Sequence, residues 1–403
     1  MKSLVIVYDG MADRPVPELG GRTPMEVACT PAMDGLSADA LIGTVLNVPA
    51  GMVPESDTAN LAILSYDPRV YSKGRSPLEA VSMGLTMAPE DTALRCNLVT
   101  LTEDGPYEEK TMLDHSSGEI TTEEARELIR ALDAALGTKD RRFHTGVSYR
   151  HCLLWRGAPD SYPFARPHDI LGRRIGSYLP GGDEGRAFLE LQKKSYDILN
   201  HHPVNEARRA RGQHVANSIW LWSPGKKPAL PSFAEKWGKK ATVISAVDLI
   251  KGIALCAGME SIDVPGATGN LHTNYRGKAE AAADAFRRGQ DMVYVHVEAP
   301  DECGHQGDAR GKVQSIEHID GEILAPLCRF LREGDEPFRI LLLPDHPTPI
   351  TLRTHSEEPV PFLLYDSTCR HRGVHHLTEE TARRAQLYLP DGTALMGMLF
   401  AQS

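Results

Sequence analysis

The chain has 403 residues, of which 41% are hydrophobic and 24% are charged, and its formal net charge at pH 7 is −10. This is the composition of an ordinary globular protein, and an acidic balance without a basic, aromatic-rich patch argues against nucleic acid as a partner. No run of about 18 apolar residues is present and Met1-Lys2-Ser3 leads directly into a predicted strand, so we expect no membrane span, no signal peptide and a cytoplasmic location.

The first predicted element is a buried strand at residues 4–8, and Asp9 follows it directly. The segment Leu-Val-Ile-Val-Tyr is short and rich in branched side chains, as buried strands are. In open α/β sheets, ligands bind beyond the carboxyl ends of the strands. Asp9 is therefore placed where such a sheet would build a site.

Ser56 lies where a loop containing Pro54 gives way to an apolar, helix-like segment at residues 57–64. A serine at a helix start is ordinarily an N-cap, and that is the structural alternative. A helix N-terminus also offers free N–H groups to phosphate, and a metal lowers the pKa of a bound hydroxyl. Ser56 is therefore also a candidate nucleophile that needs no histidine as its base.

The candidate site residues fall in two blocks, near 9–56 and 301–355, so the middle of the chain is predicted to be an inserted domain. We place the insert at residues 85–230 and the catalytic domain at residues 1–84 and 231–403. The Pro-rich run at 224–231 is the predicted return hinge.

Inside the insert, Thr121-Thr-Glu-Glu124 has the capping-box pattern and predicts a helix that ends before Gly137. Apolar runs at 98–101 and 152–155 predict strands beside it, so the insert reads as a small α+β structure. After the insert, the strand-helix pattern at 242–250 restarts the α/β sheet.

A second buried strand, at residues 292–297, is followed by Asp301 and His305, which are one helical turn apart. Pro300 and Asp301 could simply start a helix, which is the structural alternative. A helix with apolar residues from Ile316 to Leu331 comes next, and Pro326 is expected to bend it.

A third buried strand, at residues 340–343, is followed by Asp345 and His346, with His355 further on. Taken alone, Asp345-His346 before Pro347 reads as an ordinary turn. What departs from chance is the joint occurrence, because polar groups at the ends of three buried strands must be hydrogen-bonded, paired or bound to metal.

The chemistry of these groups favours two divalent ions. Three carboxylates and three imidazoles give mixed oxygen and nitrogen donors, which suit Mn, Zn, Fe or Co and fit Ca poorly. Two ions carry a charge of +4 against −3 on the carboxylates, which leaves room for a further anion and a phosphoryl group. The Ser56 hydroxyl is the candidate for that anion.

Several motifs together resemble the alkaline phosphatase superfamily and, more narrowly, the archaeal-type 2,3-bisphosphoglycerate-independent phosphoglycerate mutases. The resemblance runs through the whole chain. The motifs that carry it are Asp9–Pro15, Thr23–Glu26, Pro54–Asn60, Arg95–Val99, Gly146–His151, Gly266–Gly269, Glu298–Glu302, Gly304-His305 and Pro344–His346.

The resemblance implies an α/β fold with a mostly parallel sheet and helices on both faces, plus the inserted smaller α+β domain. One metal would be held by Asp9, Ser56, Asp345 and His346, and the other by Asp301, His305 and His355. The expected metal is Mn, with Zn, Co or Mg as alternatives, and no 2,3-bisphosphoglycerate is needed.

The implied activity is that of a glycolytic isomerase. Ser56 would accept the phosphoryl group from one glycerate hydroxyl, and phosphoserine would return it to the neighbouring hydroxyl. Water must be kept out meanwhile, which a second, closing domain would do.

A phosphorylated acid must be held by cations although the chain is acidic overall, so the positive field must be local. Arginine grips carboxylate or phosphate with two hydrogen bonds, yet most of the 44 Lys and Arg of this chain are expected to be ordinary surface residues. Our substrate-binding candidates are Arg14, Arg95, His115, Arg150, His151 and Lys278.

Three departures from the family pattern bear on the substrate. Glu55 stands where these mutases usually have Gly, His272 where an Asp is expected, and Trp222 where the archaeal mutases tend to have Arg. The Trp-rich segment resembles a bacterial branch proposed to act as a homoserine kinase. The alternative function is therefore a phosphotransferase or phosphatase acting on another small metabolite, although the sequence has no known ATP-binding loop. A binding protein with a vestigial site is a third hypothesis.

Overall fold

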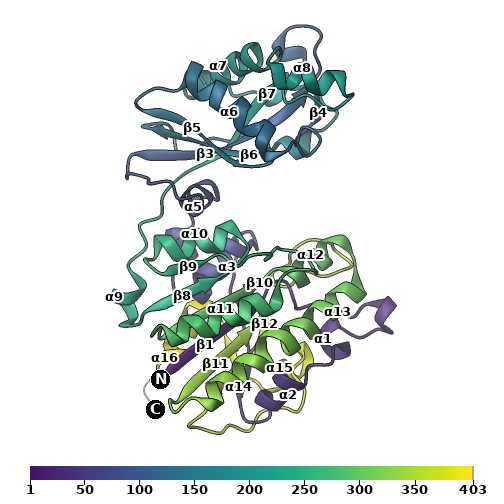
Figure 1. Ribbon diagram of the computed structural model, residues 1–403. Helices are drawn as coiled ribbons and strands as arrows, with labels where there is room; N and C mark the ends of the chain where they lie inside the picture. The colour runs from purple at the N-terminus through teal and green to yellow at the C-terminus, as the bar shows by residue number, and fades with distance from the viewer. Residues whose placement is uncertain (402–403) are drawn as a thin grey trace. The chain divides into compact units, whose positions relative to one another are not determined.

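The computed structural model describes residues 1–401, which form two compact units (Figure 1). Unit 1 contains Met1–Ser72 and the chain from Ala229 onward, and unit 2 contains Lys73–Pro228. Unit 2 starts earlier than our predicted insert because helix α5 (Ser76–Ser82) packs against its sheet. The Ser76 hydroxyl donates to the carbonyl of Ser223 and accepts the N–H of Arg95 at 3.1 Å.

Unit 1 is built on an eight-stranded mixed sheet with the order β13-β2-β12-β11-β1-β10-β8-β9. Neighbouring strands are parallel except at β12, which runs antiparallel to both β11 and β2. The mostly parallel α/β sheet predicted from the sequence is confirmed. Its strands are β1 (Lys2–Tyr8), β2 (Leu41–Val45), β8 (Ala241–Ile244), β9 (Glu260–Ile262), β10 (Met292–Val297), β11 (Phe338–Leu343), β12 (Val360–Asp366) and β13 (Tyr388–Leu389).

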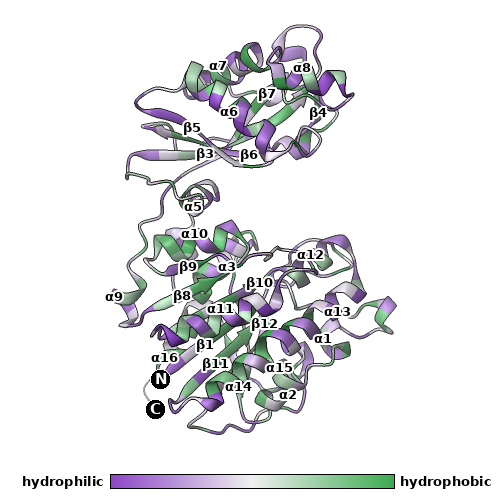
Figure 2. Ribbon diagram, in the orientation of Figure 1, coloured by the Kyte–Doolittle hydropathy of each residue, from purple (hydrophilic) through white to green (hydrophobic). Residues whose placement is uncertain are grey.

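The three strands predicted first, β1, β10 and β11, lie side by side at the centre of this sheet. Their side chains are almost completely buried, and Figure 2 shows β1 and β11 as mostly hydrophobic ribbons. Both faces are therefore covered, as parallel sheets require. All three strands end at the same edge, so the residues that follow them converge there.

Helices cover both faces of the sheet. On one face, α2, α11, α13, η5 and α14 form a single apolar core with β1, β10 and β11. On the other, α10 packs on β8 and α16 packs on β11. Across residues 1–401, each helix is too short or too polar to cross a membrane. The helices of unit 1 are η1 (Pro17–Leu19), α1 (Pro24–Val27), α2 (Pro31–Ser37), α3 (Ser56–Ile63), α4 (Pro68–Tyr71), α9 (Phe233–Trp237), α10 (Asp248–Cys256), α11 (Tyr275–Arg287), α12 (Ala299–Gln306), α13 (Ala309–His318), η5 (Ile319–Leu324), α14 (Ala325–Glu333), α15 (Glu379–Arg384), η6 (Gly392–Ala394) and α16 (Leu395–Phe400).

The predicted bend at Pro326 takes the form of a π-helical segment. The helix runs as α13, then one π turn in η5, then α14, with Pro326 in the first turn of α14. Proline lacks an N–H and its ring clashes with the carbonyl four residues earlier, so the preceding turn widens.

Unit 2 has an antiparallel sheet in which the long strand β3 pairs with β6, β7 and β4, while β5 pairs with β6. Its helices α6 and α7 pack on one face over an apolar core of their own. The elements are β3 (Asp91–Leu101), η2 (Tyr107–Glu109), β4 (Met112–Asp114), α6 (Thr122–Leu136), β5 (Arg141–Val147), β6 (Arg150–Arg156), η3 (Pro167–Ile170), η4 (Gly176–Tyr178), α7 (Gly182–Leu199), α8 (Pro203–Ala210) and β7 (Ser218–Lys226).

The start of α6 has only half of the predicted capping box. The Thr121 hydroxyl accepts the N–H of Glu124, as expected. The Glu124 carboxylate, however, is bound by Arg208 of α8 and by Arg211 just after its end. Two charged partners outcompete a single backbone N–H. The Glu124 side chain therefore joins α6 to α8 instead of completing the capping box.

Candidate metal centre

Asp9 and Asp345 lie at the carboxyl ends of the neighbouring strands β1 and β11, each 1% exposed. One oxygen of Asp345 accepts the N–H groups of Gly10, at 3.1 Å, and His346, at 2.9 Å. Its other oxygen accepts the Asn60 amide at 2.9 Å. Gly10 adopts φ +64°, and a Cβ there would lie 2.7 Å from Asp301, so the turn needs glycine.

Ser56 is the first residue of α3, whose N-cap is Glu55. Because Glu55 occupies the N-cap position, Ser56 is not the helix cap of the structural alternative. The Glu55 side chain makes no capping hydrogen bond. Its hydroxyl lies 3.1 Å from Nε2 of His346. Asn60, one turn further, donates to the Ser56 carbonyl at 2.8 Å and so ties the start of the helix to the Asp345 loop.

Asp301 and His305 lie one turn apart on α12, with Nε2 of His305 at 3.2 Å from the Asp301 carboxylate. Nε2 of His355 lies 3.4 Å from the same carboxylate and 3.0 Å from Nε2 of His305. The Nδ1 atoms of the two histidines face the carbonyls of Arg353 and Pro54, respectively. With a metal bound, those carbonyls would hold the proton on Nδ1 and leave the lone pair of each Nε2 for the ion.

His346 lies between the group around Asp9 and Asp345 and the group around Asp301. Its Nε2 lies 3.6 Å from Asp9 and 3.7 Å from Asp345, and its ring stacks on that of His355 with centroids 4.0 Å apart. The structure therefore brings all seven predicted ligand residues into one connected cluster, although they come from positions 9 to 355 of the chain.

The electrostatics of the cluster reflect crowded carboxylates. Burial, followed by the charges of Asp345 and Asp301, raises the pKa of Asp9 well above its usual range. Burial alone would also raise the pKa of Asp301, but hydrogen bonds from His305 and His355 outweigh it and hold that pKa well below its usual range. The hydrogen bond between His305 and Asp301 raises the pKa of His305 to about 9.

The cluster fits divalent cations. Asp301, His346 and His355 form one set whose donor atoms lie within 4.8 Å of one another, and Asp9, Asp345 and His346 form a second. Both Asp9 oxygens are buried and lack a hydrogen bond. A buried carboxylate that lacks a donor and lies close to other carboxylates needs a positive partner, and the mixed oxygen and nitrogen ligands suit a transition metal.

The chain is similar to known proteins over its whole length. The model for 2,3-bisphosphoglycerate-independent phosphoglycerate mutase matches residues 38–205. The enzyme of that name from Methanosarcina barkeri is 48% identical over 99% of both chains, and a probable one from Geobacter sulfurreducens is 45% identical over 99% of both. The chain belongs to this family.

Solved structures agree with this assignment. The cofactor-independent phosphoglycerate mutase of Thermoplasma acidophilum is 29% identical over 99% of both chains, with a TM-score of 0.68. A protein of Pyrococcus horikoshii gives a TM-score of 0.82 at 28% identity, over 100% of this chain and 98% of its own. The relatives are enzymes, and this member of the mutase family is therefore an enzyme as well.

Sequence reasoning missed several side chains of this mutase site. His296, inside the apolar run of β10, is fully buried with Nε2 at 3.1 Å from Asp9. Thr348 donates to Asp301, and Tyr294 donates to the Asn60 that holds Asp345. A histidine within a buried strand was the available signal, whereas the others sit in segments that read as an ordinary helix, strand or turn.

Two predicted substrate cations of this mutase lie in unit 1. Arg14 is exposed and binds the Glu358 carboxylate. Lys278 is fully buried on α11 and donates to the carbonyl of His296 at 2.8 Å, and burial lowers its pKa to about 8. The Lys278 ammonium therefore binds the backbone of strand β10. It is not available to a ligand, because the side chain is packed away from the surface.

The other four predicted cations lie in unit 2, and here Arg95 is already engaged. Its guanidinium binds Glu79 and stacks on Trp222 at 4.5 Å from the ring centroid. Trp222 donates to Asn97 at 3.0 Å, so this departure from the family pattern completes a buried cluster in the sheet. The helix α5 that carries Glu79 was the missed element.

The remaining unit 2 cations differ in exposure. Arg150 is exposed beside Tyr149 and His115 is half-buried against the same ring, whereas His151 is only 4% exposed. Of the other departures, Glu55 is half-buried and His272 is exposed. Which of these residues contacts substrate stays a prediction.

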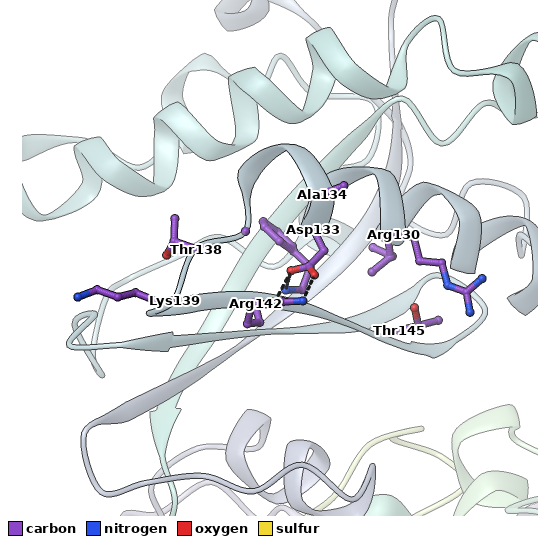
Figure 3. A pocket seen from close by; sticks show the side chains of 10 residues that line it. Arg130, Asp133, Ala134, Thr138, Lys139, Arg142 and Thr145 are labelled. Atoms are coloured by element: carbon purple, nitrogen blue, oxygen red, sulfur yellow. Dashed lines mark hydrogen bonds and ion pairs between the residues drawn. The ribbon is translucent and has the colours of Figure 1, made fainter.

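A separate cavity of about 540 Å³ lies between α6 and β5 in unit 2 (Figure 3). In it, Arg142 faces Asp133 and binds its carboxylate, which also accepts the N–H of Phe143 at 2.9 Å. The lining holds none of the predicted site residues. Its residues are Ile129, Arg130, Asp133, Ala134, Gly137, Thr138, Lys139, Arg142, Phe143 and Thr145.

We expect His151 to make unit 2 less stable in mild acid. Burial lowers its pKa to about 3, whereas an unfolded histidine has a pKa of about 6.5. Below pH ~6.5 only the unfolded state takes up the proton, so stability falls by about 1.4 kcal/mol per pH unit until the folded state also titrates. Urea unfolding followed by tryptophan fluorescence at pH 7 and 5.5 measures the loss, since Trp155, Trp220 and Trp222 lie in unit 2.

The matched variant is His151→Asn, whose amide oxygen can still accept the Gly146 N–H that His151 Nδ1 accepts at 3.0 Å. Its unfolding free energy should change less between the two pH values than that of wild type. An equal pH dependence in both proteins would show that His151 is not responsible.

Proposed function

We propose that the protein interconverts 3-phosphoglycerate and 2-phosphoglycerate through a phosphoserine at Ser56, without 2,3-bisphosphoglycerate. The observation that carries this proposal is the position of the Ser56 hydroxyl, 3.1 Å from His346 in a cluster of buried carboxylates and imidazoles at the start of a helix. The names of the relatives favour this reaction over the alternative of another phosphotransferase.

Two divalent ions are part of the proposal, with Mn as the expected metal. Asp9, Ser56, Asp345 and His346 would hold one ion, and Asp301, His305 and His355 the other. When bound, such ions lower the pKa of a coordinated hydroxyl and neutralise phosphoryl oxygens. The distances between neighbouring members of the cluster, 3.0 to 3.7 Å, support a shared site.

The chain's own groups would orient the reaction. Helix α3 begins at Ser56, and helix N-termini bind phosphate through backbone N–H groups, while Asn60 fixes this turn against Asp345. Ser56 would attack phosphorus as the glycerate oxygen leaves with the electron pair of the broken P–O bond. The reverse attack by the neighbouring hydroxyl would regenerate the serine.

Unit 2 is proposed to keep water from the phosphoserine. Hydrolysis would turn the mutase into a phosphatase, so a cover is needed while the glycerate reorients. Unit 2 is a compact insertion into the catalytic unit, and His115 and Arg150 on it are the predicted cations best placed by exposure to meet an anion.

The proposal is tested by turnover with 3-phosphoglycerate and Mn²⁺ in the absence of 2,3-bisphosphoglycerate. We expect 2-phosphoglycerate to form and inorganic phosphate release to be slow by comparison. A parallel reaction supplies homoserine and ATP. Phosphohomoserine formation without mutase turnover would favour the alternative function instead.

A further inference from the structure

A lysine that belongs to none of the predicted sites is buried behind the metal cluster. Lys312 of α13 is fully buried, and its ammonium donates to the carbonyl of Thr348 at 2.8 Å, to the carboxylate of Asp13 at 2.7 Å and to the carbonyl of Ala12 at 3.4 Å. These acceptors lie on two loops, one after β1 and one after β11. A single cation therefore joins the loop that carries Asp9 to the loop that carries Asp345 and His346.

The partner of this lysine is held just as firmly. The Asp13 carboxylate also accepts the N–H groups of Arg14, at 2.8 Å, and of Ile350, at 3.2 Å. The Asp13 N–H donates to Glu379 at 3.0 Å. A buried ion pair with its remaining lone pairs filled by backbone donors fixes the loops that supply those donors, and breaking it leaves an uncompensated charge.

Thr348, which Lys312 holds in place, contacts predicted ligands of both metal ions. Its hydroxyl donates to Asp301 and lies 3.4 Å from Nδ1 of His346, which belong to different proposed metal sites. Its N–H donates to the carbonyl of Ala12 at 3.3 Å. Thr348 is thus held at its N–H and its carbonyl while its side chain touches one predicted ligand of each ion.

We propose that Lys312 is a positioning residue that couples the two metal sites. By anchoring Thr348 and the Ala12 carbonyl, it sets the separation of Asp301 and His346 and thereby the affinity of both ions. Groups behind the ligands of a metal commonly change its affinity by about 10–100-fold when they are removed. The inference rests on the proposed two-metal centre.

The test is a titration of the purified full chain with Mn²⁺, following free Mn²⁺ by electron paramagnetic resonance. Wild type should bind two ions. Lys312→Met should bind both about 10–100-fold more weakly. Thr348→Val, which removes only the hydroxyl, should weaken both as well, whereas His305→Ala should mainly weaken one.

A second variant covers the case in which Lys312→Met does not fold. The double change Asp13→Asn with Lys312→Met removes both charges, and it still lacks the donor to Thr348, so its affinities should also fall. The matched control is Arg339→Met. Arg339 is another buried cation of unit 1, paired with Asp366 at 2.6 Å at the opposite end of β11, and its loss should lower the melting temperature without weakening Mn²⁺ binding.

The outcomes separate the two proposals. If wild type binds no Mn²⁺, the two-metal function fails. If wild type binds two ions and the Lys312 variants bind them with unchanged affinities, the function stands and the coupling role of Lys312 is overturned. Weakening of one site only would also overturn the coupling, because the anchor touches ligands of both.

Discussion

Replacing Ser56 with alanine is expected to lower mutase turnover by on the order of 10⁴-fold or more while leaving the fold intact. The Ser56 hydroxyl is the candidate nucleophile at the cluster, 3.1 Å from Nε2 of His346. Because Ser56 does not cap α3, its loss should cost little stability. Steady-state turnover with 3-phosphoglycerate and thermal unfolding measure the two effects.

The control is Ser261→Ala on the edge strand β9, which should keep wild-type turnover. Wild type quenched in acid during turnover should carry a phosphoryl group on the peptide that contains Ser56, detected by mass spectrometry. A near wild-type rate in Ser56→Ala would end the phosphoserine mechanism.

Replacing Asp345 with asparagine is expected to lower the metal content from two ions to about one per chain, and turnover by at least about 10²-fold. Asp345 is 1% exposed, and its oxygens accept from Gly10, His346 and Asn60. An asparagine would lose the charge and turn an NH₂ group toward one of these donors. Elemental analysis after gel filtration gives the stoichiometry.

The control for this experiment is Asp284→Asn on α11, where the exposed carboxylate binds the exposed Arg287 at 2.6 Å. Its metal content should equal that of wild type. An unchanged stoichiometry in Asp345→Asn would contradict the assignment of Asp345 as a ligand.

The centre of the fold could be predicted from the sequence because its signals are local. The strands β1, β10 and β11 are apolar runs of branched residues, and a carboxylate follows each one shortly after its end. The rule that parallel strands end at a common edge then places Asp9, Asp301 and Asp345 together. For the same reason α6, with its cap and its apolar stripe, was within two residues of its predicted bounds.

The supporting contacts could not be predicted, because they join segments far apart in the chain. Lys312 and Asp13 are separated by 299 positions, and neither residue has a local pattern that names its partner. Arg95 carries the right charge for a substrate, but Glu79, on an unpredicted helix, binds it. Charge alone identifies a candidate, and only the packing shows whether that charge is already neutralised.

The antiparallel part of the sheet was also missed. Strand β12 has Pro361 as its second residue, which argues against a buried strand when the sequence is read alone. Strand β2 contains Gly43, where a Cβ would lie 2.6 Å from the carbonyl of Leu387. Proline and glycine both weaken the sequence pattern that predicts a strand. At position 43 glycine is needed because the segment at Leu387 approaches the backbone closely.

The central position of β1 has a consequence for synthesis on the ribosome. Ser3 pairs with Met292 and Lys2 with Phe338, so β1 must wait for partner strands that are made much later in translation. At ~5–20 residues per second, that delay is roughly 15–60 s. During it, the mostly apolar strand β1 stays unpaired while Lys73–Pro228 can already fold behind it, so we expect chaperones to be needed at β1 rather than in the inserted unit.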